Sequence, residues 1–284
     1  MKPRTCLSIG NIGLSRVYDV VDYAKSKDVE FIELRFDMIS ETARSKGHFH
    51  KDAVLPEIKK IISYAKNKGI KTIAANRDIS YGANACISFL EKQRAAKSSD
   101  SSGLKIAEKS GDRDSEPERI KFLRDVIELG IDICDIELDV LERNVIKNFI
   151  EFAHSKKTQV ILSVHDFKGQ IGLLDTVRFY LDSSYFGADY FKLSDTVISD
   201  EDALSVSEKN IKIRSIKMTE EKAFPEFIIF GMGEKGRITR ALSVICGSCF
   251  AYCSSPFGIT APGQTTPEEF YKTADFLGTL KWAQ

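Results

Sequence analysis

The sequence predicts a (β/α)8 TIM barrel, an α/β fold in which eight parallel strands alternate with helices. Three observations lead to this fold class. The chain has 284 residues, enough for one large domain. Short β-prone runs alternate with amphipathic helical stretches along its length. No G-x-G-x-x-G follows the first β-prone run, which disfavours the main alternative, a doubly wound open sheet.

The predicted strands are runs rich in β-branched and other apolar residues. In chain order they are 5–11, 30–37, 71–77, 132–139, 159–166, 189–195, 226–232 and 249–255. The clearest helical periodicities between and after them lie at 54–69, 118–130, 141–157 and 266–282. The last helix has Thr266 at its N-cap and Pro267 at its first position.

One segment interrupts this alternation. Residues 96–117 are rich in Ser, Asp, Lys and Gly and poor in apolar residues. Such a composition cannot bury enough surface to order itself. We therefore expect a single domain, 1–284, with a flexible insertion at 96–117 between the third strand and its helix.

Composition excludes several classes of protein. Positive and negative charges balance at 41 each, so nothing favours nucleic acid or an acidic membrane as a partner. The N-terminal residues lack the apolar core of a secretory signal, and the longest apolar-leaning run, 241–252, is too short to span a bilayer. Six cysteines in so long a chain do not indicate a disulfide framework. We expect a cytoplasmic protein.

Two short motifs could suggest metal or redox chemistry. Cys246 and Cys249 form a C-x-x-C, with Cys253 close behind, and His48 and His50 form an H-x-H. Neither has further ligands nearby in the sequence. We expect small buried thiols and a solvated loop, and no metal site.

Polar side chains recur on one face of five consecutive predicted strands. In the run 30–37, Glu33, Arg35 and Asp37 alternate with apolar residues and so share a face. The same rule places on that face Ala75, Arg77, Asp135, Glu137, Asp139, Ser163, His165, Tyr190, Lys192 and Ser194. We expect this face to point into the barrel near the C-terminal ends of the strands, where TIM-barrel active sites lie.

Lys192 stands between apolar residues in its run, although lysine is seldom buried. Glu137, His165 and Lys192 are predicted on neighbouring strands at similar heights, with His165 between the carboxylate and the amine. A carboxylate can orient an imidazole, which trades protons near neutral pH. A desolvated lysine near other cations has a lowered pKa and can attack a carbonyl to form a Schiff base. A structural Lys–Glu pair is the alternative.

Two loops complete the predicted mouth of the barrel. After the seventh strand, the Gly-rich stretch 231–240 opens a helix near Gly236, with Arg240 one turn in. Its free N–H groups could bind an anion, and Arg240 could clamp a carboxylate. The polar loop 254–265 follows the last strand and could form a lid.

These motifs, taken in order, resemble the type I 3-dehydroquinate dehydratases. The motifs are E-L-R-x-D at 33–37, D-I-E-L at 135–138, S-x-H-D at 163–166, the lysine at 192, and A-P-G-Q at 261–264. The resemblance implies a (β/α)8 barrel, usually dimeric, that uses no metal or cofactor. It also implies the dehydration of 3-dehydroquinate to 3-dehydroshikimate in the shikimate route to aromatic amino acids.

The resemblance also assigns roles to residues of this chain. Lys192 would form an imine with the substrate ketone, and His165 would remove the adjacent proton and then protonate the departing hydroxyl. Glu137 would orient His165. The substrate-binding residues would be Glu33, Arg35, Arg77, Arg240, Thr260 and Gln264. Many members carry Glu-Gly-Gly shortly after the strand-3 arginine, whereas here Arg77 is followed by DISYGANA.

Two other functions fit the same residues. One is a different lysine-dependent barrel lyase, such as a class I aldolase, with a phosphate site at 231–237. Strong inhibition by inorganic phosphate would favour it. The other is a non-catalytic relative that binds small acids, which the absence of turnover would reveal.

Overall fold

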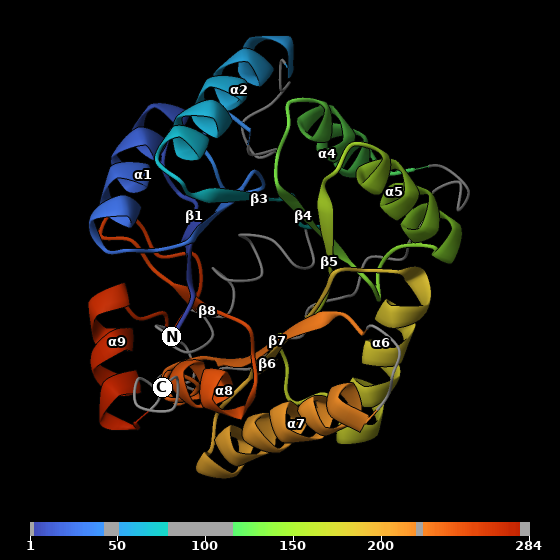
Figure 1. The fold of residues 1–284 in the computed structure, drawn as a ribbon, viewed down its shortest axis with the longest axis vertical. Coiled ribbons are helices and arrows are strands. Elements are labelled where there is room, and N and C mark those ends of the chain that lie inside the picture. The colour runs from blue at the N-terminus through green and yellow to red at the C-terminus, as the bar shows by residue number, and fades with distance from the viewer. Residues whose placement is uncertain (1–2, 43–50, 79–115, 220–223, 279–284) are drawn as a thin grey trace, which may run out of the picture.

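Eight parallel strands form a barrel, and helices surround it (Figure 1). The structure is a computed structural model that describes residues 3–42, 51–78, 116–219 and 224–278. The strands pair in the order β7-β6-β5-β4-β3-β2-β1-β8. The Cys249 N–H donates to the Phe227 carbonyl at 2.9 Å, which links the start of β8 to β7. The predicted TIM barrel is confirmed.

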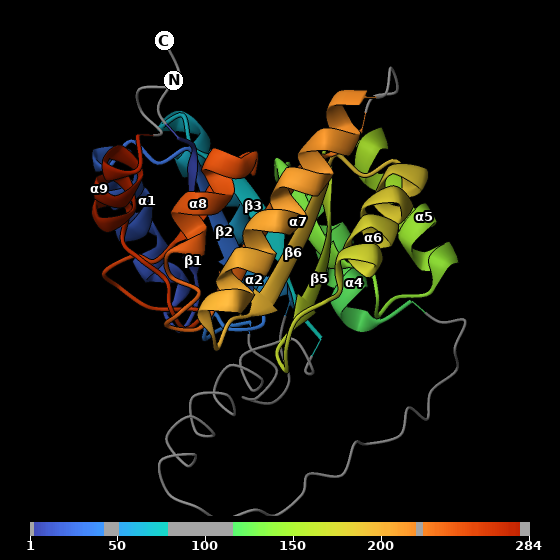
Figure 2. The same ribbon diagram turned by 90° about the horizontal axis from the view of Figure 1, so that it is seen from below.

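All eight predicted strands form, and most are shorter than expected. They are β1 (Thr5–Ile9), β2 (Phe31–Arg35), β3 (Lys71–Ala75), β4 (Ile133–Glu137), β5 (Gln159–Asp166), β6 (Tyr190–Thr196), β7 (Glu226–Met232) and β8 (Ala251–Cys253). β8 shows the largest difference, because Ser254 and Ser255 leave the ladder and begin the loop that follows. Figure 2 shows the strands from the side, with the helices packed outside them.

The outer layer consists of helices that each bury one apolar face. Their bounds are η1 (Leu14–Arg16), α1 (Val17–Ser26), α2 (Lys51–Asn67), α4 (Glu118–Glu128), α5 (Arg143–Ser155), α6 (Leu173–Phe186), α7 (Asp200–Thr219), α8 (Thr239–Cys246) and α9 (Pro267–Phe276). In α5, Val145, Phe149 and Ala153 recur at helical spacing and are buried. In α9, Thr266 and Glu269 form a capping box around Pro267, as the sequence predicts.

The helix after β7 begins three residues later than expected. Gly236 lies in a tight turn, where an added Cβ would sit 2.5 Å from the Met232 carbonyl oxygen. α8 starts at Thr239, whose hydroxyl donates to the Gly236 carbonyl at 2.5 Å and accepts from the Gly231 N–H at 2.8 Å. Arg240 is therefore the second residue of α8.

The inside of the barrel is apolar at the end where the strands begin. Phe31, Ile133, Ile161 and Tyr190 meet there, and Phe31 stacks on Phe250 with ring centroids 4.8 Å apart. On each of these four strands, the residue two positions later is polar and also buried. Each of these strands thus places an apolar side chain in the lower part of the barrel and a buried polar side chain above it.

Two features expected from the sequence lie outside the residues that the structure describes. These are residues 96–115 of the expected insertion and the H-x-H pair. Within the described part of the chain, none of the helices has the length and apolar character needed to cross a membrane.

Candidate active site at the C-terminal end of the barrel

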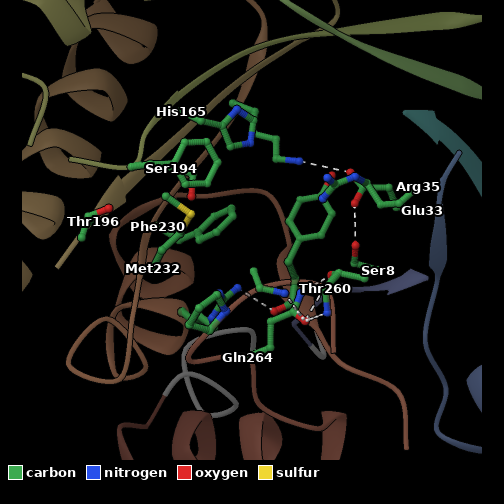
Figure 3. A pocket seen from close by; sticks show the side chains of 16 residues that line it. Ser8, Glu33, Arg35, His165, Ser194, Thr196, Phe230, Met232, Thr260 and Gln264 are labelled. Carbon is green, nitrogen blue, oxygen red and sulfur yellow. Dashed lines mark hydrogen bonds and ion pairs between the residues drawn. The ribbon is translucent and has the colours of Figure 1, made fainter. Parts of the chain in front are cut away.

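A pocket opens above the apolar floor, at the C-terminal ends of the strands (Figure 3). In Figure 3, His165 lies at one end of it and Gln264 at the other, with Glu33 and Arg35 along one side. Seven of the nine predicted site residues line it, namely Glu33, Arg35, His165, Lys192, Arg240, Thr260 and Gln264. Residues that sequence reasoning did not assign to the site also line it, among them Ser8, Ser194, Phe230, Met232 and Tyr252.

Lys192 is almost completely buried, with 3% of its surface exposed. Its Nζ lies 3.1 Å from Glu33 Oε1 and 3.0 Å from Asp135 Oδ2. Two carboxylates therefore contact this amine directly, and the nearby cation Arg77 binds the same Asp135 carboxylate. Only an unprotonated amine attacks a carbonyl, and both carboxylates lie within hydrogen-bonding distance of Nζ.

Asp135 anchors this group, although the sequence analysis gave it no role. The Arg77 guanidinium binds both of its carboxylate oxygens, and Ser163 Oγ donates to Oδ1 at 2.6 Å. Burial alone would raise the pKa of Asp135, but Arg77 and Lys192 hold it well below its usual range. The carboxylate is thus charged at neutral pH. The signal was present in the sequence, since Asp135 shares a face with the predicted site residue Glu137.

Glu33 is the second partner of Lys192, and its other oxygen is also held. Ser8 Oγ on β1 donates to Glu33 Oε2 at 2.7 Å. Burial opposes ionisation of Glu33, but the charges of Lys192 and Arg35 outweigh it and lower its pKa. Arg35 itself binds Asp37 through two hydrogen bonds of 3.0 and 2.7 Å. Glu33 thus holds Lys192 and Arg35 holds Asp37, and a role for either in substrate binding stays a prediction.

Glu137 lies away from the pocket lining and makes other contacts. Its Oε1 accepts from the Asp78 N–H at 2.9 Å, and its Oε2 binds Arg119 Nη1 at 2.6 Å. In the sheet register, Glu137 is level with Ser163, and Ser163 is level with Lys192. The prediction that Glu137, His165 and Lys192 share one height is therefore wrong. Side-chain alternation gives the face but not the register between strands.

His165 stands one step above this level, opposite Ser194 in the ladder, and faces the pocket. Burial, together with the charges of Arg77 and Lys192, lowers its pKa well below the usual value. The imidazole is consequently neutral at pH 7 and can accept a proton. Its ring lies nearly parallel to that of Phe167, with centroids 6.0 Å apart.

Arg240 is a buried guanidinium that contacts no carboxylate in the described part of the chain. Its Nε and Nη1 donate to the carbonyls of Gly263 and Tyr252, each at 3.1 Å, and it lies 4.7 Å from the Phe230 ring centroid. Its Nη2 has no hydrogen-bond partner among the described residues. Burial lowers the pKa of Arg240 to about 10, so it is still a cation at neutral pH. An anion entering the pocket would find this charge uncompensated.

The loop around Arg240 is arranged differently from the expectation. The N–H groups of Gly231, Gly233 and Gly236 all donate to other protein atoms. These three N–H groups are therefore not free to bind an anion, whereas Arg240 Nη2 has no hydrogen-bond partner among the described residues. Gln264 closes the adjoining loop, because its Oε1 accepts from the Thr260 N–H at 3.0 Å and its Nε2 donates to Thr260 Oγ1 at 3.0 Å.

The Cys, His and acidic side chains of the described ranges were the candidates for a metal site. These ranges contain no group of three or more His, Cys, Asp or Glu side chains that could hold a metal ion. The thiols of Cys246, Cys249 and Cys253 are free, and Cys253 is buried.

The Glu137–Arg119 pair yields a stability prediction. Both side chains are buried, so Glu137→Ala leaves the Arg119 charge with only the more distant, partly exposed carboxylate of Asp78 at 3.7 Å and should cost about 3 kcal/mol of unfolding free energy. Urea denaturation measures this. Glu118→Ala, on the exposed side of α4, is the control and should change stability by less than about 0.5 kcal/mol. Equal stability of the two variants would show that the buried pair does not hold this region.

Comparison with known proteins places the chain in a family. The sequence profile of type I 3-dehydroquinase matches residues 5–281. A 3-dehydroquinate dehydratase of Methanocaldococcus jannaschii is 32% identical over 164 residues, which cover 56% of this chain and 68% of that protein. One of Coxiella burnetii is 30% identical over 149 residues, covering 51% of this chain. The match spans only 57% of the length of that relative.

A solved structure agrees with these matches in its fold. A type I 3-dehydroquinate dehydratase from Clostridium difficile superposes with a TM-score of 0.73 at 21% identity, over 98% of this chain and 93% of that one. The family profile covers nearly the whole chain, from β1 to beyond α9. The chain belongs to the type I 3-dehydroquinase family.

Proposed function

We propose that this chain is a 3-dehydroquinate dehydratase, which converts 3-dehydroquinate to 3-dehydroshikimate through an imine on Lys192. The observation that carries the proposal is the buried Lys192 Nζ, held at 3.0–3.1 Å by two carboxylates on the wall of a pocket. Family membership and the names of the relatives support the same activity. The reaction belongs to the shikimate route to aromatic amino acids and needs no cofactor.

The pocket suits a small cyclic acid that carries a ketone. Arg240 takes the substrate carboxylate, because its guanidinium is buried without a carboxylate of its own. This places the ketone toward Lys192. Arg35, Thr260 and Gln264 line the space between these ends and offer donors to ring hydroxyls or to the carboxylate.

Chemistry begins when Lys192 loses a proton. Glu33 and Asp135 are the carboxylates in contact with Nζ, and His165 is a neutral base on the next strand. The free amine adds to the ketone, and loss of water gives a protonated imine. The imine withdraws electrons and acidifies the neighbouring C–H bond. His165 removes that proton and returns one to the departing hydroxyl, after which hydrolysis frees Lys192.

Asp135 and Arg77 act behind the reacting amine. Arg77 keeps Asp135 ionised, and Asp135 in turn holds Nζ in place. We assign to Asp135 the support of Lys192, a role different from the orientation of His165 that the resemblance gave to Glu137. Arg77 then serves as a positioning residue and does not contact the substrate, since it does not line the pocket.

The structure disfavours the two competing functions. A sugar-phosphate aldolase needs free donors in the loop after β7, but the N–H groups of the three glycines in that loop donate to other protein atoms. A non-catalytic relative has no need to bury a lysine beside a neutral histidine. Inorganic phosphate should therefore inhibit weakly at most.

Borohydride trapping tests the imine directly. With 3-dehydroquinate and borohydride, the wild-type chain should gain one covalent adduct, which peptide mapping should place on Lys192. Lys192→Ala should form no adduct and show no multiple turnover. Lys209→Ala is a matched control, because Lys209 is equally buried and paired with Asp195 but lies on α7 outside the pocket. Turnover by the Lys192 variant at the control's rate would rule out the imine mechanism.

The lowered pKa of His165 gives a pH prediction. A lowered pKa favours the neutral form, so protonation removes the base only at a pH well below the ordinary value of about 6.5. The wild-type kcat/KM should stay level as pH falls from about 8 to about 6. His165→Ala should lower kcat by about 100-fold or more while still permitting slow imine formation. A fall in wild-type kcat/KM centred near pH 6.5 would contradict the assigned environment of His165.

We also propose that two copies associate through α6 and α7, which lie side by side on the outer surface (Figure 2). Leu204, Ile211 and Met218 are exposed on α7 at intervals of seven residues, and α6 adds Leu181 and Tyr185. A two-fold axis at Ile211 would pair Leu204 with Met218 of a second copy. It would also bring the exposed Glu208 opposite the exposed Arg214. A two-fold arrangement would thus pair apolar residues with apolar residues and opposite charges with each other.

Ile211→Asp tests this association. A carboxylate at the centre of the apolar face should raise the dimer dissociation constant at least about tenfold. Light scattering over a range of concentrations measures it. Phe276→Asp is the control, because Phe276 is exposed on α9, far from α6 and α7 (Figure 1). A dimer that survives Ile211→Asp unchanged would place the contact elsewhere.

Location in the cytoplasm stays a prediction from the sequence.

A further inference from the structure

Tyr252 on β8 is a buried tyrosine with no role in the mechanism above. It lines the pocket, and only 2% of its surface is exposed. Among the described residues, its hydroxyl has no hydrogen-bond partner. The buried Tyr180 on α6 differs, since its hydroxyl donates to the Pro225 carbonyl at 3.0 Å. An unpaired buried hydroxyl is costly, so a pocket that keeps one has a use for it.

The ring of Tyr252 is held next to the reacting amine. Lys192 Nζ lies 4.0 Å from its centroid. Phe230 and Phe250 pack against it with centroids 5.7 and 5.4 Å away, and the Tyr252 carbonyl accepts from Arg240 Nη1 at 3.1 Å. Packing on these sides and the tied backbone restrict the ring to one orientation.

The hydroxyl lies in the field of the charges that hold Lys192. Burial raises the pKa of Tyr252 well above its ordinary value, and the carboxylates of Glu33 and Asp135 raise it further. Tyr252 therefore keeps its proton over the whole working pH range and is a permanent donor. Neither carboxylate is within hydrogen-bonding distance of it, so the donor is available to a ligand.

We propose that the Tyr252 hydroxyl donates a hydrogen bond to the ketone oxygen of the substrate while Lys192 attacks the carbonyl carbon. This inference rests on the proposed function. The nitrogen lone pair forms the C–N bond, and the π pair of the carbonyl moves onto the oxygen. A donor positioned there stabilises that developing charge.

The proton balance leaves Tyr252 unchanged. The Lys192 ammonium and the ketone give a protonated imine and water. Two of the three protons on Nζ leave with the oxygen by way of the neighbouring bases, and the third stays on nitrogen. Tyr252 keeps its own proton throughout and acts only as a hydrogen-bond donor.

A different role for Tyr252 would use only its ring. The π face could stabilise the Lys192 ammonium without any part for the hydroxyl. Tyr252→Phe separates the two roles, because phenylalanine keeps the ring and removes only the oxygen. Tyr180→Phe is the matched control, since it removes a phenol oxygen from an equally buried ring outside the pocket.

The experiment measures imine formation and stability for the wild type and both variants. Single-turnover reactions with 3-dehydroquinate are quenched with borohydride at a series of times, and intact mass gives the adduct. Tyr252→Phe should slow imine formation by about 10- to 100-fold. Its melting temperature should equal or exceed that of the wild type, because an unpaired buried hydroxyl is gone. Tyr180→Phe should show the opposite pattern, with wild-type imine formation and a lower melting temperature.

Two results would overturn the inference. Tyr252→Phe could form the imine at the wild-type rate, which would leave only the ring with a role. It could also lose melting temperature and the rate of imine formation together, which would make the hydroxyl structural. Absence of any adduct in the wild type would overturn the proposed function and this inference with it, and is distinct from both results.

Discussion

The architecture of this barrel depends on the ion pairs that keep Lys192 inside it. A buried ammonium is costly unless carboxylates compensate it, and Glu33 and Asp135 do so at about 3 Å. Asp135 in turn needs Arg77, while Ser8 holds the far oxygen of Glu33. These contacts connect strands β1, β2, β4 and β6 with Arg77, which lies two residues after β3. The apolar floor below excludes water, so water does not solvate the buried charge of Lys192 in place of these carboxylates.

The same network explains why imine chemistry suits the site. Lys192, Arg77 and Arg35 bring three positive charges, and Glu33, Asp135 and Asp37 bring three negative ones. A protonated imine keeps the positive charge on the nitrogen, so the covalent intermediate leaves this balance unchanged. Arg240 stands outside it and can therefore meet an anion. The charges of the network help to keep His165 neutral, and a neutral imidazole can accept a proton.

Sequence reasoning recovered the barrel and most of its pocket, because alternation and strand order are local patterns. It placed Lys192, His165 and Glu33 on the inward face, where the structure has them. It failed where the outcome depends on contacts between distant elements. In the register of β4 against β5, Glu137 lies opposite Ser163 and not opposite His165. Its carboxylate binds Arg119 on α4. Asp135 was visible on the same face, but only the register shows that it reaches Lys192.

One hydrogen bond gives the pocket a fixed length. Arg240 Nη1 is bonded to the Tyr252 carbonyl, and the ring of that residue touches Lys192 Nζ. A single residue of β8 thus sets the spacing between the charge that receives an acid and the amine that receives a carbonyl. The site therefore selects ligands by the distance between their carboxylate and their carbonyl. Keto acids with these two groups too close together or too far apart can satisfy one end only, and selectivity follows from distance as well as from the choice of contacts.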